Sequence, residues 1–299
     1  MIVVRGGTYK EALGWNARPA TQSQPIVLQA YPGEQPVVSG TIALRGADFW
    51  RVNGFRFVYD STIQSGQAIA TFAGGTGWTF ENNEVTGTTG VANLIIEATK
   101  PSSTTNAALI KAAPNDYTVS GNCITQNRGY GEHGTMHNIY LMSSIYSTGG
   151  LIERNFLAGA PRGANIKAAA STPATANASP RNVLIRNNTM LYAASGVTIG
   201  LKSEGISVEK NLIALPSGSQ QYDGGVKTYQ LARANKNAVK DSLISGYTNA
   251  LKPDFGATTT IFTARNSNES VAFTGSVANC NVVPTSAVLK AKYGALATG

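Results

Sequence analysis

The sequence predicts an all-β solenoid, a single-stranded right-handed parallel β-helix with lateral loop insertions. Three observations lead to this fold class. Short apolar runs broken by Gly, Asn, Ser and Thr dominate the 299 residues, and only 13% of residues are charged. One six-residue pattern recurs along the chain. Its copies at Asn188 and Asn211 lie 23 residues apart (211 minus 188), about the length of one bare coil.

The recurring pattern is an apolar residue, two polar or small residues, Asn, any residue and a second apolar residue. Its copies carry Asn53, Asn83, Asn122, Asn155, Asn188 and Asn211, and a degenerate copy carries Ser242. The earlier steps, of 30, 39, 33 and 33 residues, leave room for loops. Each coil must bend sharply, and Asn tolerates the left-handed backbone of such a bend. We therefore expect these residues to adopt that conformation and to form a hydrogen-bonded ladder, with their apolar neighbours inside.

A second strand follows the bend in each coil. The segments are His137–Leu141, Ala164–Ala168, Gly196–Gly200, Gly225–Thr228 and Ala250–Lys252. Their aligned inward residues are Ile139, Ile166, Val226 and Leu251. The residues that then point outward on one face are Tyr140, Lys167, Lys227 and Lys252. The third segment adds Thr198 or Gly200, according to its register. The pattern predicts a basic column with one aromatic residue, parallel to the helix axis.

Loops flank this column. The segment 126–137 carries Arg128 and Tyr130, Ala160–Gly163 carries Arg162, and 216–224 carries Tyr222. The stretch 168–180 is rich in Ala, Ser, Thr and Pro without apolar periodicity, which is typical of a flexible flap.

We expect one domain over residues 1–299, with regular coils over about 1–254 and a segment over 255–299 that closes the C-terminal end of the core. Met1 runs directly into the strand Ile2–Val4, with no secretory signal and no capping element. We therefore expect either a longer protein or a neighbouring domain or subunit that covers the N-terminal coil. Cys123 and Cys280 match no metal or redox spacing, and the pattern favours a buried, inert thiol at Cys123.

The net charge of +8 favours anionic partners. The chain lacks the dense Lys/Arg clusters of nucleic-acid-binding proteins, and no apolar run approaches the about 20 residues of a membrane span. Acidic sugars are the anionic partners that remain, and we expect the protein to bind an acidic polysaccharide.

The opening residues Ile2–Tyr9, followed by Pro25–Gly33 and Val37–Gly40, resemble the first coils of right-handed β-helix proteins. This superfamily includes pectate-lyase-like enzymes, the chondroitinase B and alginate lyase group, and phage tailspikes. The resemblance implies a location outside the cell or on a virion surface. In the lyase group a strand Lys is followed one coil later by an Arg. Lys167 matches the Lys, whereas Lys202 stands near the position of the Arg. The resemblance also implies calcium, but the stretch Arg162–Ile166 lacks the expected acidic ligands, so we expect no cofactor.

Cleavage of a uronic-acid polymer by β-elimination needs a base, a positive group that neutralises the substrate carboxylate, and a proton donor for the leaving oxygen. Lys167 as base, Tyr140 or His137 as acid and Arg162 as neutraliser meet these needs. The expected substrate-binding residues are Arg128, Tyr130, Lys202, Tyr222, Lys227 and Lys252.

Other interpretations stay open. These residues can instead be solvated side chains on an exposed sheet, so the sequence alone does not decide whether the protein is an enzyme. Hydrolysis is the less favoured reaction, because it needs two carboxylates and only Glu132, Glu153 and Asp223 are candidates. Glu132, His133 and His137 are a weak metal pattern within a glycine-rich loop. The alternative function is a non-catalytic structural or receptor-binding section of a phage tailspike, fibre or surface protein.

Overall fold

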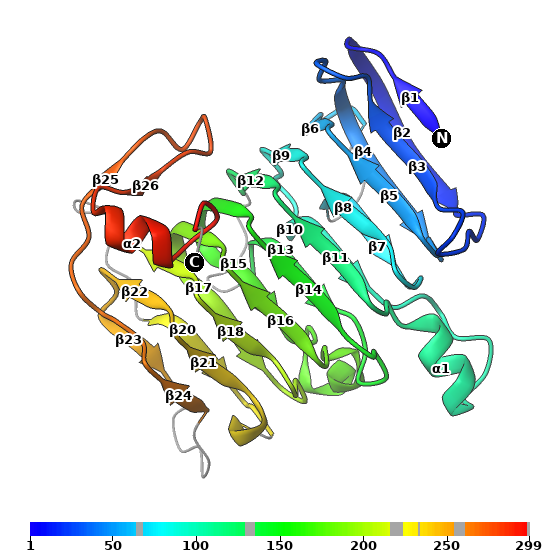
Figure 1. Ribbon diagram of the computed structural model, residues 1–299. Helices are drawn as coiled ribbons and strands as arrows, with labels where there is room; N and C mark the ends of the chain where they lie inside the picture. The colour runs from blue at the N-terminus through cyan, green and yellow to red at the C-terminus, as the bar shows by residue number, and fades with distance from the viewer. Residues whose placement is uncertain (64–67, 129–134, 216–223, 233, 254–260, 298–299) are drawn as a thin grey trace.

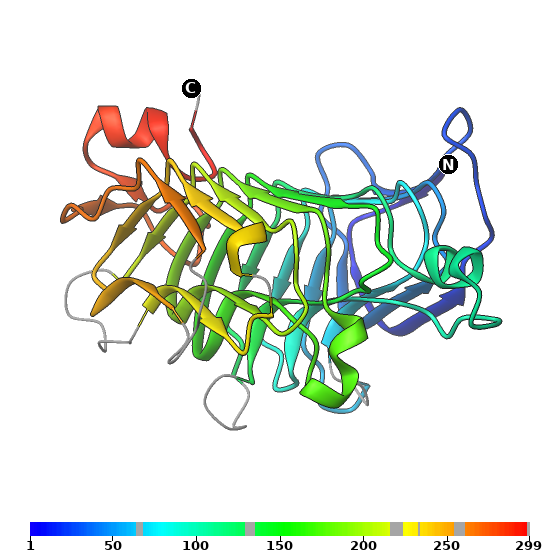
Figure 2. The same ribbon diagram turned by 90° about the horizontal axis from the view of Figure 1, so that it is seen from below.

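The protein is a right-handed parallel β-helix, as the sequence predicted. The computed structural model describes residues 1–63, 68–128, 135–215, 224–232, 234–253 and 261–297. The strands stack coil upon coil from the N-terminal end to the C-terminal end of an elongated body (Figure 1). The view from below shows the same succession of coils from the side (Figure 2).

Within the described residues, the strands form two long sheets and one short antiparallel pair. The ten-stranded sheet, which we call face A, contains β1 (Ile2–Val4), β3 (Ile26–Ala30), β5 (Trp50–Asn53), β8 (Thr79–Glu81), β11 (Tyr117–Ser120), β14 (Gly150–Glu153), β16 (Val183–Arg186), β18 (Ser207–Glu209), β21 (Ala238–Lys240) and β24 (Phe262–Ala264). The second sheet contains β2 (Thr8–Asn16), β4 (Val37–Arg45), β6 (Arg56–Val58), β7 (Ala68–Ala73), β9 (Glu84–Thr86), β10 (Ala92–Glu97), β12 (Cys123–Thr125), β13 (His137–Met142), β15 (Phe156–Ala168), β17 (Thr189–Gly200), β19 (Leu212–Ala214), β20 (Gly224–Tyr229), β22 (Leu243–Ser245) and β23 (Asn249–Lys252). The remaining elements are the pair β25 (Phe273–Thr274) and β26 (Val283–Pro284), the helices α1 (Asn106–Ala112) and α2 (Ala287–Lys292), and the 3-10 helices η1 (Pro173–Ala178) and η2 (Ala234–Lys236).

The second sheet is divided into two faces, and the long strands β15 and β17 each belong to both of them. The first halves of β15 and β17 align with β12 and β19, and their second halves align with β13 and β20, with a register shift between Ala160 and Ala164. We call the side of β6, β9, β12, β19 and β22 face B, and the side of β7, β10, β13, β20 and β23 face C. Each coil therefore contributes to three faces.

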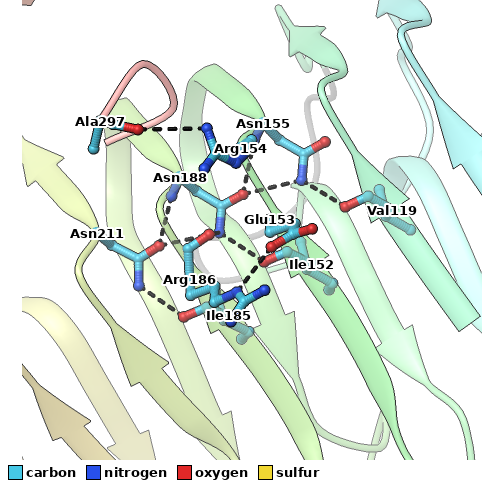
Figure 3. Close-up of polar contacts among 10 residues, drawn as sticks. All are labelled: Val119, Ile152, Glu153, Arg154, Asn155, Ile185, Arg186, Asn188, Asn211 and Ala297. Atoms are coloured by element: carbon cyan, nitrogen blue, oxygen red, sulfur yellow. Dashed lines mark hydrogen bonds and ion pairs between the residues drawn. The ribbon is translucent and has the colours of Figure 1, made fainter. Parts of the chain in front are cut away.

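The asparagine ladder predicted from the repeat is present at the bend between faces A and B (Figure 3). Asn155 is typical: its amide nitrogen donates to the carbonyl of Val119 at 2.9 Å and to the side-chain oxygen of Asn188 at 3.0 Å. The backbone N–H of Asn155 donates to that same oxygen at 3.0 Å. The ladder continues beyond the predicted series, because Asn266 accepts from the backbone N–H of Ser242. Every ladder asparagine therefore joins consecutive coils through both backbone and side chain.

Two details of the predicted ladder are wrong. The left-handed residue is the one before each ladder asparagine, as at Asn82 (φ 53°), Arg154 (φ 53°) and Asn187 (φ 51°). The ladder asparagine itself is needed for its amide group. Asn53 is also outside the ladder, because Val52 aligns with Phe80, so that Phe55 occupies the ladder position. The backbone N–H of Phe55 donates to the side-chain oxygen of Asn83 at 3.0 Å.

A second, shorter ladder lies at the bend that leads into face C. The amide nitrogen of Asn93 donates to the side-chain oxygen of Asn138 at 2.9 Å, and Asn138 donates likewise to Asn165 at 2.7 Å. All three side chains are fully buried. The sequence carried a signal for it, since each Asn precedes an inward Leu or Ile, but our pattern did not include it. This ladder fixes the strands that carry His137, Tyr140 and Lys167.

The inward residues stack into one continuous core. Face A contributes the fully buried column Val52, Phe80, Val119, Ile152, Ile185, Val208 and Val239. Face B contributes Phe57, Val85, Ile124, Leu157, Met190, Ile213 and Ile244. The interior of the coils is thus filled with side chains, so a polymer has to bind on the outside.

Cys123 is not the inert thiol expected from sequence, because it forms a disulfide with Cys280. Their Cα atoms are 5.9 Å apart although 157 positions separate them in sequence. The segment that contains Cys280 packs on an apolar strip of face B formed by Phe156, Leu191 and Leu212. It is anchored again where the N–H of Gly294 donates to the carbonyl of Lys210. The described C-terminal residues after β24 therefore run back along the flank of the coils, as α2 and β25–β26 do in Figure 1.

The N-terminal coil presents apolar side chains to solvent. Ile2, Val3 and Trp15 are exposed, and most of β2 is exposed along its length. In the described residues, no helix has the length and apolar character needed to cross a membrane.

Candidate functional site

The basic column on face C has the register that the sequence predicted. Tyr140 aligns with Lys167, Lys167 with Thr198, Thr198 with Lys227, and Lys227 with Lys252. The inward partners Ile139, Ile166, Val197, Val226 and Leu251 align in the same way. Thr198, one of the two alternatives for its coil, is therefore the residue in the column.

Lys167 and Tyr140 point out of the coil but are not solvated. Only 8% of Lys167 and 3% of Tyr140 is exposed, so the interpretation of these two residues as solvated side chains on an open sheet is wrong. The ammonium nitrogen of Lys167 lies 4.7 Å from the centre of the Tyr140 ring and 5.6 Å from that of Tyr229. The negative faces of the two rings attract the cation. In the described part of the chain, no carboxylate pairs with Lys167.

Tyr229 is the member of this site that sequence reasoning missed. It lies two residues after Lys227 on β20, and its hydroxyl donates to the carbonyl of Ala170 at 3.1 Å. Its ring passes over the intervening coil at Gly200, where an added Cβ would collide with it. Gly200 therefore makes room for the ring that covers Lys167.

The stretch 168–180, expected to be a flap, supplies the other part of the cover. Ala169 and Ala170 are fully buried, and the hydroxyl of Tyr140 donates to Ser171 at 3.1 Å. The backbone N–H of Ile145 donates to the carbonyl of Asn177, which ties η1 to the neighbouring coil.

His137 is buried beside Tyr140, with 5.1 Å between the ring centres. Its Nδ1 accepts a hydrogen bond from the N–H of Ala164 at 3.0 Å, so the neutral ring carries its proton on Nε2. Nε2 has no partner among the described residues. Gly163 permits this arrangement, because a Cβ there would collide with the carbonyl of Met136. Among the described residues, the N–H of His137 is therefore a buried donor without a partner, near the charge of Lys167.

The electrostatics of the site follow from burial. Removal from water disfavours the charged ammonium and lowers the pKa of Lys167 from 10.5 to about 8. Burial, and secondarily the charge of Lys167, holds the pKa of His137 well below its ordinary value. Burial raises the pKa of Tyr140, and its hydrogen bond to Ser171 opposes that shift. At neutral pH the site therefore contains a neutral imidazole, a protonated phenol and a lysine that loses its proton easily.

The other residues expected at the site are dispersed. Lys227 and Lys252 are half-buried further along the same column, and Arg162 is exposed in the bulge of β15. Lys202 is exposed and donates to the side-chain oxygen of Asn177 in η1 at 2.9 Å. Arg128 lines a hollow on face B. Tyr130 and Tyr222, like Glu132, His133 and Asp223, lie outside the described residues.

The residues before Lys167 do not fit the calcium ion that the resemblance implies. Calcium takes several oxygen ligands, mainly carboxylates and carbonyls. The side-chain oxygen of Asn165 already accepts from Asn138, and Arg162 brings a positive charge. Across the described ranges, no group of three or more His, Cys, Asp or Glu residues could hold a metal ion.

Fold and site together define a parallel β-helix with a covered, cationic and aromatic site on one flank. No family model and no curated protein matches the chain. Among solved structures, it is similar to an alginate lyase from Paenibacillus sp. str. FPU-7, with 14% identity, 90% of this chain and 92% of that chain covered, and a TM-score of 0.47. It is also similar to the pectate lyase Pel9A, with 12% identity, 90% and 68% covered, and a TM-score of 0.49.

A mannuronic acid-specific polysaccharide family 6 lyase from the human gut microbiota is a third similar structure, with 13% identity, 84% and 76% covered, and a TM-score of 0.36. The parallel β-helix fold itself is shown by the stacked parallel strands of this chain. Likenesses of this degree do not assign an activity, which has to be argued from the chain's own residues.

Proposed function

We propose that this protein binds an acidic polysaccharide along face C and cleaves it by β-elimination at Lys167. One observation carries the proposal: Lys167 is buried between two tyrosine rings with no carboxylate partner among the described residues. A lysine whose only function is solubility gains nothing from burial, which costs free energy. A base, in contrast, needs a pKa near the working pH, and burial lowers the pKa of Lys167 to about 8.

The reaction begins when the neutral amine of Lys167 removes the proton from the sugar carbon next to the carboxylate. The electron pair of that bond forms a carbon–carbon double bond, and the adjacent glycosidic carbon–oxygen bond breaks. The leaving oxygen then takes a proton. Tyr140 is suited to supply it, because its raised pKa keeps the phenol protonated until a strongly basic oxygen develops.

The substrate carboxylate must be neutralised while negative charge builds up on the adjacent carbon. Arg162 is the exposed cation on the same strand as Lys167 and supplies charge in this role. His137 is not the acid in this proposal, because its pKa is held low and its N–H, on Nε2, is buried within the protein. Lys227 and Lys252 extend the positive column and hold further acidic sugar units.

The disulfide supports a location in an oxidising compartment, outside the cell or on a virion surface. A disulfide between distant segments persists there, whereas the cytosol would reduce it.

The test is incubation of the chain with polygalacturonate, alginate, chondroitin sulfate and hyaluronan, followed at the ultraviolet absorbance of unsaturated products. We expect one polymer to be cleaved by the native protein and none by Lys167→Met. Lys111→Met, which makes the same change on α1, is the matched control and keeps full activity. If no polymer yields an unsaturated product, the protein is better explained as a non-catalytic section of a tailspike, fibre or surface protein.

A further inference from the structure

The polar hollow lined by Arg128 lies on face B, away from the site at Lys167 on face C. It has a volume of about 290 Å³ and a neighbour of about 390 Å³, and Glu84 and Ala278 line both. The shared residues show that the two hollows adjoin, and we call them together the trough, which lies along the outer side of β6, β9 and β12. Its size is that of a small ligand site.

The floor of the trough consists of hydrogen-bonding groups from consecutive coils. The hydroxyls of Thr86 and Thr125 lie 3.1 Å apart, so one donates to the other, and both residues line the hollow. Gly87, with φ 91°, follows Thr86 and leaves the floor open beside Tyr59. This pair of hydroxyls, one from each of two neighbouring strands, suits a ligand that carries hydroxyl groups itself.

The charges of the trough leave one excess positive group. Arg56 is paired with Glu84 at 3.1 Å, and both are partly exposed. Arg128 is exposed and donates to the side-chain oxygen of Gln126 at 2.6 Å, and no carboxylate pairs with it within the described chain. The backbone N–H of Arg128 donates to the carbonyl of Thr88 at 2.7 Å, which fixes the start of its side chain. Its guanidinium is thus held in position for a planar anion such as a carboxylate.

The outer wall of the trough is the turn that contains Ala278. The disulfide from Cys280 to Cys123 fastens this turn to β12, two residues from Thr125. Within the turn, the N–H of Ser276 donates to the side chain of Asn281 at 2.7 Å, and the N–H of Cys280 donates to the carbonyl of Val277 at 3.1 Å. The wall is therefore held in place before any ligand arrives, which lowers the entropy cost of binding.

We infer that this trough is an accessory binding site for an acidic oligosaccharide, in which Arg128 holds a sugar carboxylate while Thr86, Thr125 and Glu84 bind hydroxyl groups. It shares its ligand class with the proposed function but does not require catalysis at Lys167. Because it lies on face B, it holds the polymer independently of face C.

The test is calorimetric titration with tri-galacturonate, made in the full-length Lys167→Met background so that cleavage plays no part. Arg128→Ala should weaken binding at least fivefold, and Ala278→Trp should weaken it by filling the trough without removing a charge. Arg51→Ala, the same charge loss on face A, is the matched control and leaves the affinity unchanged. Thermal melts of all variants establish that each is folded.

Cellotriose, which has hydroxyls but no carboxylate, should bind at least fivefold more weakly than tri-galacturonate. Unchanged affinity in both Arg128→Ala and Ala278→Trp would overturn the inference, since all binding would then occur elsewhere. Equal affinity for the neutral and the acidic trisaccharide would overturn it as well. Neither result depends on whether the native protein is a lyase.

Discussion

The burial of Lys167 makes a quantitative prediction about stability. The shift of its pKa from 10.5 to about 8 corresponds to about 3 kcal/mol against the charged form. Attraction to the rings of Tyr140 and Tyr229, about 0.5–2 kcal/mol, acts in the opposite direction. A net cost of about 1–3 kcal/mol remains at pH 7. Replacement of Lys167 by Met, which is similar in shape and uncharged, should therefore raise the free energy of unfolding by this amount.

The pH dependence separates this effect from a simple packing change. The pKa of Lys167 is lower in the folded chain than in the unfolded chain, so the folded chain loses this proton first as the pH rises. The native protein accordingly gains stability from about pH 8 upward, until the unfolded chain also loses the proton near its ordinary pKa. Lys167→Met lacks this gain. Urea unfolding of both proteins should show that Lys167→Met has the higher free energy of unfolding at pH 7. This difference between the two proteins should shrink towards zero at pH 10. A difference that is the same at both pH values would refute the reasoning.

Two further predictions concern the scaffold. Asn155→Ala should lower the free energy of unfolding by about 2 kcal/mol or more, because it leaves the buried carbonyl of Val119 and the N–H of Asn122 without partners. Asn187→Gly, at the left-handed position of the next coil, should change the free energy of unfolding by less than about 1 kcal/mol. Equal effects of the two substitutions in urea unfolding would contradict this division of roles. Replacement of Cys123 and Cys280 by Ala should lower the free energy of unfolding by about 2–4 kcal/mol and make the segment around Ala278 sensitive to protease. An unchanged melting temperature and digestion pattern would count against the anchoring role of the disulfide.

The sequence was sufficient for the coil order because the repeat combines two independent requirements. A buried amide ladder and inward apolar residues on both sides occur together only at a β-helix bend. The error at Asn53 arose because Trp50, Val52, Phe55 and Phe57 are all apolar, so the apolar positions of the pattern are also met when it is displaced by two residues, with Phe55 in place of the asparagine. The alignment of Tyr140 with Lys167 was predictable, because successive side chains of a strand point to opposite sides. Once Ile139 and Ile166 are placed inward, the next residue of each strand points outward.

The cover over the site could not be read from the sequence. Tyr229 reaches Lys167 across a coil only because Gly200 has no side chain, and a single glycine gives no periodic signal. The disulfide was missed for a related reason, because the C-terminal segment does not carry the repeat and nothing in its sequence specifies which coil it contacts. Burial of Lys167, on which the proposed chemistry depends, is thus a property of the tertiary structure.

The rate of unsaturated-product formation as a function of pH tests the central claim most directly. If Lys167 is the base, the initial rate on the cleaved polymer should rise about tenfold per pH unit below about pH 8 and level off above it, because only the neutral amine accepts the proton. Lys167→Arg, which stays charged throughout this range, should be inactive at every pH. A profile without a transition near pH 8, or an active Lys167→Arg protein, would contradict the account.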